Sequence, residues 1–243
     1  MGVLEIACNG AASAFAASSG GADRIELCSD LGSGGTTPPA GTLAVVREHV
    51  RLPVHVLVRP RAGNFVYDPR TLEVMQAEIA HACRIGCDGI VTGALTADGR
   101  VDAEACAALV AASGSLPVTF HRAFDYVHDR AAALEQIIAL GFCRVLSSGG
   151  QPTALRGADV LAADVARAQG RVLIMAGAGI TPANIAEVAR RSSCHELHAS
   201  ASVWRGGASV PVQVTPALQG LDAAHRETDA TCVAALRAAL DNG

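Results

Sequence analysis

The sequence has no CxxC pair, no clustered run of basic residues and no apolar run long enough to span a bilayer. Its eight cysteines lack the spacing that a zinc site needs. The net charge of -4 is mild, so neither nucleic acid nor a membrane is expected as a partner. Residues 1–6 lack the basic start of a secretory signal, so we expect a soluble, cytoplasmic protein that binds a small molecule or a metal ion.

The apolar content is sufficient for one large core. Hydrophobic residues make up 50% of the chain and charged residues 17%, a balance that argues against disorder. The length of 243 residues matches the usual size of one (β/α)8 domain, about 250 residues, and leaves no room for a second domain.

Short runs rich in Val, Ile and Leu alternate with Ala-rich stretches, and the count of such pairs reaches eight. Strands are predicted near 3–7, 24–28, 54–58, 89–92, 117–121, 143–147, 172–176 and 195–200. Helices are predicted near 10–20, 40–50, 69–85, 102–113, 129–140, 156–169, 181–191 and 229–241. Because polar residues end nearly all the strands, this order predicts a single (β/α)8 TIM barrel over residues 1–243, with a doubly wound parallel sheet as the alternative.

Residues 205–228 break this pattern with Gly, Pro and polar residues. We predict an irregular loop there, which lies over or beside the barrel mouth or forms an oligomer contact.

Polar side chains at the carboxyl ends of the strands are the candidates for chemistry, because the loops of such a barrel converge there. Side-chain alternation along the strands predicts an inward ring of charged residues: Glu5, Glu26, Arg59, His121 and His198. Arg61, Arg122 and Asp125 follow just beyond it. Buried charges are costly unless they are paired, so the ring indicates either a polar pocket or a network of ion pairs that fills the barrel.

In the pocket interpretation, Arg59 and Arg61 clamp an anion by forked hydrogen bonds. His121 or Glu26 then moves a proton. Asp125 either orients His121 or pairs with Arg122.

Two glycine-containing segments follow the sixth and seventh strands, and they include Ser147, Gly149, Gly177 and Gly179. Such segments expose backbone N–H groups that can hold a phosphate, and His198 and Ser200 end the neighbouring strand. The alternative is that the glycines are needed only for tight turns.

Several distinctive sequence motifs occur in order between residues 3 and 204: Gly21-Ala22-Asp23-Arg24-Ile25-Glu26-Leu27-Cys28, Gly34-Gly35-Thr36-Thr37-Pro38, Arg59-Pro60-Arg61-Ala62-Gly63-Asn64-Phe65 and Phe120-His121-Arg122-Ala123-Phe124-Asp125. Together they resemble the CutC family. The resemblance implies a (β/α)8 barrel, a cytoplasmic location, a homodimer or homotetramer, and a role in copper homeostasis. It also implies copper(I) as a ligand, held by Cys8 and Cys28, and soft thiolates do suit this ion.

Alternation along a regular first strand places Cys8 on the face opposite Glu5, whereas Cys28 shares a face with Glu26. The charged ring suits an anionic organic ligand better than a soft metal. The alternative function is therefore an isomerase, epimerase or lyase type of enzyme that acts on a small anionic, perhaps phosphorylated, metabolite. No nucleotide cofactor is expected. A catalytically silent barrel is a third alternative, and it explains the polar ring least well.

Overall fold

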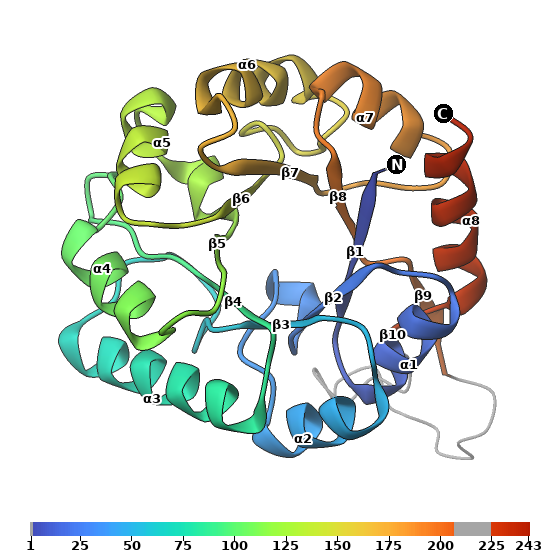
Figure 1. The fold of residues 1–243 in the computed structure, drawn as a ribbon, viewed down its shortest axis with the longest axis horizontal. Helices are drawn as coiled ribbons and strands as arrows, with labels where there is room; N and C mark the ends of the chain where they lie inside the picture. Colours follow the sequence, from blue (N-terminus) through green and yellow to red (C-terminus); the bar gives the residue numbers. More distant parts are fainter. Residues whose placement is uncertain (1, 207–224) are drawn as a thin grey trace, which may run out of the picture.

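A computed structural model of the protein describes residues 2–206 and 225–243. Eight parallel strands close into a barrel in sequence order, and the helices surround it (Figure 1). The barrel strands are β1 (Val3–Cys8), β2 (Arg24–Leu27), β3 (Val54–Leu57), β4 (Gly89–Thr92), β5 (Val118–Phe120), β6 (Arg144–Ser147), β7 (Leu173–Gly177) and β8 (Glu196–Ala199). The predicted (β/α)8 barrel is confirmed.

The helices that cover the barrel are α1 (Ala11–Ser19), α2 (Ala40–His49), α3 (Pro69–Ile85), α4 (Ala103–Ala112), α5 (Arg130–Ala139), α6 (Ala158–Ala168), α7 (Ile185–Ser192) and α8 (Ala230–Asp241). Two short 3-10 helices, η1 (Leu31–Ser33) and η2 (Arg122–Tyr126), lie in the loops after β2 and β5. Aspartates begin several helices: Asp68 accepts a hydrogen bond from the Thr71 N–H, and Asp129 caps α5 in the same way. None of the helices in these described ranges is long and apolar enough to cross a membrane.

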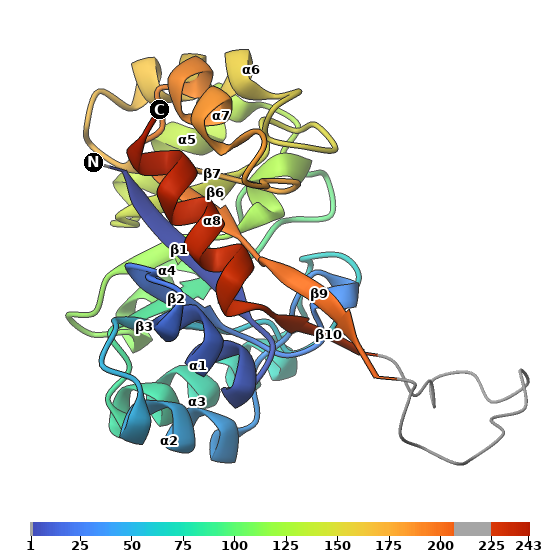
Figure 2. The same cartoon turned by 90° about the vertical axis from the view of Figure 1, so that its right-hand side faces the viewer.

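Two predicted boundaries are wrong. Helix α7 begins at Ile185 and not at Thr181, because the Asn184 side chain accepts the Thr181 N–H and donates to the Gly179 carbonyl, which closes a separate turn. The predicted loop at 205–228 contains strand β10 (His225–Thr228), which pairs antiparallel with β9 (Ser202–Arg205). Residues 207–224 of that prediction lie outside the described residues. Figure 2 shows the two strands running out together past the start of α8.

The interior of the barrel is polar at the bottom and becomes a cavity at the top. Strand alternation and register stack the inward side chains in layers from alternate strands, as barrels of this kind require. The lower layers hold Arg24, Arg144, Glu196, Glu5, His55, Thr119 and Met175. The apolar core lies between the strands and the helices, where Leu4, Ile6 and Phe120 are fully buried.

Gly89 provides a test of how tightly the lower layers are packed. A Cβ atom at this position would lie 2.6 Å from His55 Nε2. Because both groups are inside the barrel, Gly89→Ala should lower the free energy of unfolding by roughly 1–3 kcal/mol. Denaturant unfolding measures this change. Gly41→Ala is the matched control, since a Cβ at Gly41 on helix α2 meets no atom within 4 Å. Equal effects of the two substitutions would contradict the packing.

Candidate active site

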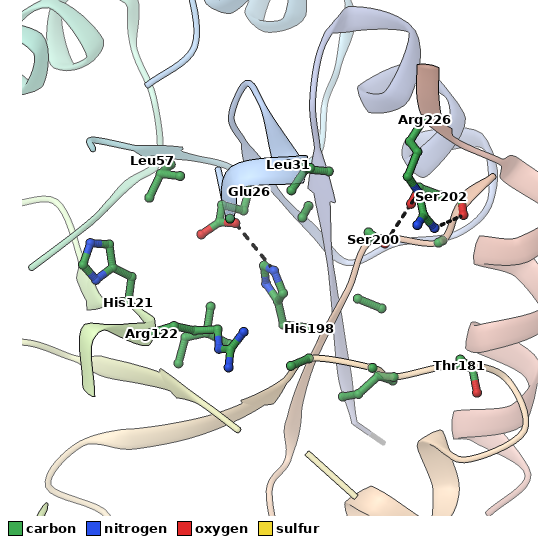
Figure 3. Close-up of a pocket in the computed structure, with 18 of the residues that line it drawn as sticks. Glu26, Leu31, Leu57, His121, Arg122, Thr181, His198, Ser200, Ser202 and Arg226 are labelled. Carbon is green, nitrogen blue, oxygen red and sulfur yellow. Dashed lines mark hydrogen bonds and ion pairs between the residues drawn. The ribbon is translucent and has the colours of Figure 1, made fainter. Parts of the chain in front are cut away.

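A cavity of about 450 Å³ opens at the carboxyl ends of the strands. Among the described residues, its ionisable lining consists of one carboxylate, Glu26, the three guanidinium groups of Arg59, Arg122 and Arg226, and the imidazoles of His121 and His198. Figure 3 shows Glu26 and His198 facing each other near its centre, between His121 and Arg122 on one side and Ser200, Ser202 and Arg226 on the other. The lining therefore has more positive than negative groups, which favours an anionic occupant.

Below the cavity, a network of buried ion pairs fills the barrel. Arg24 binds both Glu5 and Glu196, and Arg144 binds Glu196 and the Thr119 hydroxyl. Burial opposes the charge of Glu5, but the hydrogen bond from His198 and the nearby Arg24 outweigh it and lower the pKa of Glu5 well below its ordinary value. The ion-pair network expected as one alternative is thus present, and it occupies the lower layers.

His198 connects this network to the cavity. Its Nδ1 lies 2.7 Å from Glu5 Oε1, and its Nε2 lies 3.5 Å from Glu26 Oε2. Burial opposes the imidazolium, but the carboxylates of Glu26 and Glu5 raise the pKa of His198. Glu26 is buried and has no arginine bound to it among the described residues, so burial raises its pKa to about 7, although His198 opposes the rise. A carboxyl group with this pKa exists in both protonation states near neutral pH.

His121 is a neutral donor at the cavity wall. It follows β5 and begins η2, where its Nδ1 accepts the N–H of Ala123 at 3.3 Å, so the proton must lie on Nε2. Burial and the charge of Arg59 lower the pKa of His121 to about 3. Its Nε2 is buried and has no partner among the described residues. The Nε2–H of the neutral imidazole is therefore an unused hydrogen-bond donor among the described residues.

The two arginines predicted to form an anion clamp have other partners. Arg59 lines the cavity but donates to the carbonyls of Ser33, Gly35 and Gly63, which holds two loops together. Arg61 is exposed and donates to groups of its own loop, including the Val66 carbonyl. The sequence places both residues near the mouth, but their long side chains bind the backbone of the loops.

Asp125 pairs with Arg122 and does not contact His121 through any hydrogen bond of the described residues. Its carboxylate also accepts the N–H groups of Ser148 and Gly150 and the hydroxyl of Ser147. Burial opposes ionisation, but these hydrogen bonds and the Arg122 charge lower the pKa of Asp125. The segment 147–150, predicted to hold a phosphate, thus holds a carboxylate of the protein itself.

The segments after β7 and β8 both line the cavity, at Gly179 and from His198 to Ser202. Gly177 is needed for packing, because a Cβ there would lie 2.6 Å from Leu146 Cδ1. Gly149 has a similar constraint, since a Cβ would lie 2.5 Å from the Gly157 carbonyl oxygen.

The two cysteines implied as copper ligands belong to different clusters of the core. Cys8 packs in the layer between strands and helices, whereas Cys28 packs with Leu57 and Val91 inside the barrel. The Cys28 thiol donates to the Cys8 carbonyl at 3.5 Å. Burial, with the charge of Glu26, raises the pKa of both thiols well above the ordinary value.

Three residues of the site were not among the predicted ones: Arg24, Arg144 and Arg226. Alternation gives a signal for the first two, since Arg24 lies two residues before Glu26 on the same strand and Arg144 begins β6. Arg226 reaches the site because of the pairing of β9 with β10, which the sequence pattern did not indicate.

Glu5, Glu26 and His198 are also the only described group of three or more metal-ligand residues whose ligand atoms lie within 4.8 Å of one another. Two carboxylates and an imidazole are harder donors than copper(I) prefers. The Arg24 guanidinium bound to Glu5 also opposes a second cation there.

The fold and the site define a (β/α)8 barrel with an acid–base cluster at the mouth. The sequence profile of the CutC family matches residues 2–203, and the chain belongs to this family. A CutC family protein of Xylella fastidiosa (strain 9a5c) is 52% identical over 82% of this chain and 74% of its own length. The copper homeostasis protein cutC homolog of Homo sapiens is 49% identical over 84% of this chain and 74% of its own. The solved CutC structure from Streptococcus agalactiae has a TM-score of 0.79 and 31% identity, and covers 82% of this chain and 99% of its own.

The raised pKa of Glu26 makes a prediction about stability. The folded state keeps the Glu26 proton up to about pH 7, whereas the unfolded state releases it near 4.5. The contribution of Glu26 to the free energy of unfolding should therefore fall as the pH rises between these values and level off above them. Glu26→Gln mimics the protonated acid and serves as the reference. Urea unfolding of both proteins across this range should show the variant gaining stability relative to the wild type as the pH rises. A constant difference would show that the Glu26 pKa is ordinary.

Proposed function

We propose that the protein is an acid–base enzyme of the isomerase, epimerase or lyase type, and that its substrate is a small anionic metabolite. The observation that carries the proposal is the arrangement of Glu26 opposite His198 in a cavity where the other charged groups of the described residues are arginines. Each feature has a matching role in proton transfer next to a carbonyl group.

In this proposal Glu26 is the base. Its carboxylate removes a proton from a substrate carbon next to a carbonyl, and the protonated acid returns the proton to the neighbouring carbon on the same face. Inversion by an epimerase would need a second acid on the opposite face. His198, oriented by Glu5, supports the negative form of Glu26. The Nε2–H of neutral His121 donates to the carbonyl oxygen as its negative charge develops.

One lyase mechanism does not fit the composition. Schiff-base chemistry on a protein side chain uses a lysine amine. All 19 basic residues of this sequence are arginines, so no lysine is present. A lyase reaction here would therefore proceed through an enolate stabilised by hydrogen bonds.

The test measures turnover against a panel of small ketoses, aldoses, hydroxy ketones and their phosphates. Exchange of substrate C–H for deuterium, followed by NMR in D2O, detects the proton transfer even when the overall equilibrium lies near one. Glu26→Gln should reduce exchange by on the order of 10²–10⁴-fold, because the base is lost. His121→Asn should slow exchange by about 10²-fold.

Ser19→Ala at the exposed end of helix α1 is the control and should exchange at the wild-type rate. Exchange that is unchanged in Glu26→Gln would remove the proposal. Absence of exchange with every compound, combined with unaltered metabolite levels in a deletion strain, would do the same.

Copper(I) binding by Cys8 and Cys28 is the second candidate, in keeping with the name of the human relative. The contact between the Cys28 thiol and the Cys8 backbone supports it, because the two residues are neighbours on adjacent strands. Binding would require both thiols to lose their protons and the Cys8 side chain to leave the helix-facing layer.

Anaerobic titration with copper(I) against a competing chelator tests this candidate. Cys8→Ser and Cys28→Ser should each weaken binding by at least about 10-fold, since thiolates are the preferred ligands. Cys106→Ser is the matched control, because Cys106 is a buried residue of helix α4 whose thiol donates to the Ala94 carbonyl. Equal copper(I) affinity in all three variants would exclude these ligands.

A further inference from the structure

One end of the cavity carries a continuous set of donors that the proton-transfer proposal does not use. Ser200 Oγ and Ser202 Oγ lie 3.1 Å apart, and Arg226 Nε donates to Ser202 Oγ at 3.1 Å. Arg226 Nη2 also donates to the Ser202 carbonyl at 3.0 Å. Figure 3 shows this end separated from His121 and Arg122 by the Glu26–His198 pair.

Arg226 differs from the other two cavity arginines in its partners. Arg122 is paired with Asp125, and Arg59 is bound to three carbonyl oxygens. No carboxylate of residues 2–206 or 225–243 lies within 4.0 Å of the Arg226 guanidinium, and its Nη1 makes no hydrogen bond with them. Its positive charge thus has no carboxylate partner among the described residues, and it lies at the cavity wall, where an anion can reach it.

Three residues in the lining of the cavity have an unusual backbone conformation. Ala178 and Gly179 have φ values of 82° and 67°, and Ala201 has a φ of 46°. All three residues line the cavity, at the ends of β7 and β8. Alanine rarely adopts positive φ, and such strain gathers at binding sites. Successive N–H groups in some turns form a concavity that suits an anion.

A second loop of the same barrel shows how such a concavity is filled. After β6, the carboxylate of Asp125 binds the N–H groups of Ser148 and Gly150. That segment is therefore satisfied from within the chain. The loops after β7 and β8 therefore remain available to an external anion. Barrels of this architecture commonly bind phosphate at these loops.

We propose that Ser200, Ser202 and Arg226, with the turns at 178–179 and 201, bind the phosphate group of a phosphomonoester substrate. Guanidinium, hydroxyl and backbone donors lie around this end of the cavity, and a tetrahedral phosphate has three oxygens to accept from different directions, whereas a planar carboxylate has two. The role of this phosphate site in catalysis rests on the proposed function, because the bound phosphate would hold the reacting carbon of the substrate near Glu26. Its binding test requires no turnover.

The chain contains a reporter for this test. Trp204 is its only tryptophan, and the Arg226 guanidinium lies 5.7 Å from the centre of its ring. Titration with inorganic phosphate should produce a saturable change in Trp204 emission, with the same affinity measured by calorimetry. Arg226→Gln should weaken phosphate binding by on the order of 10-fold or more, because a charge-assisted hydrogen bond is lost.

Arg205→Gln is the matched control. It removes the same charge from the same pair of strands, but the Arg205 guanidinium is bound to Asp229, so phosphate affinity should stay within about twofold. Circular dichroism checks that both variants remain folded. Four results would overturn the assignment: no saturable binding to the wild type, wild-type affinity in Arg226→Gln, an equal loss in Arg205→Gln, or acetate binding as tightly as phosphate.

The outcome also separates the two proposals. Phosphate binding that depends on Arg226, without any proton exchange that depends on Glu26, would keep this site and remove the proposed enzyme. Proton exchange that depends on Glu26, without phosphate binding at Arg226, would keep the enzyme and remove this site.

Discussion

The pairing of Arg24 with both Glu5 and Glu196 is the interaction on which the interior of the barrel depends. A charge inside a barrel is costly unless an opposite charge and enough hydrogen bonds satisfy it. Arg24 forms ion pairs with two carboxylates at once, and Arg144 forms a further ion pair with Glu196. Removal of Arg24 would leave the buried Glu5 carboxylate without an arginine partner, whereas removal of Arg144 would leave Glu196 with Arg24 alone. Arg24 binds Oε2 of Glu5, which leaves Oε1 of the same carboxylate to bind His198 Nδ1.

The ion-pair network influences the orientation and the pKa values of ionisable groups in the cavity. Because Glu5 stays ionised, it holds His198 in one orientation and raises the pKa of that imidazole. His198 in turn lies against Glu26, which has no such satisfied partner and so keeps its proton to higher pH. Two carboxylates on adjacent strands thus differ in pKa, because Glu5 is bound by both His198 and Arg24 whereas Glu26 is buried at the cavity without an arginine among the described residues. Such a separation is typical of acid–base sites.

Strand periodicity is a local property, which is why the sequence could predict the barrel and the inward positions of Glu5, Glu26 and His198. Partners of long side chains depend on loops that are distant in sequence. Arg59 binds carbonyls at 33, 35 and 63, and no pattern in the sequence indicates which loops these are. The same limit applies to Asp125, whose partners in segment 147–150 lie more than twenty residues away. Pairing of β9 with β10 across residues 207–224 is equally non-local.

The cysteines and the charged cavity call for different explanations. Regular alternation sends Cys8 toward the helices and Cys28 into the barrel, so a copper(I) site needs a local rearrangement before two thiolates can meet. The charged cluster needs no such change, because Glu26, His198 and His121 already line one cavity. A protein that bound copper only through thiols would gain nothing from burying these ionisable groups, each of which costs free energy to desolvate. Their cost is explained if the cavity binds an anion and moves a proton, and the copper hypothesis by itself leaves it unexplained.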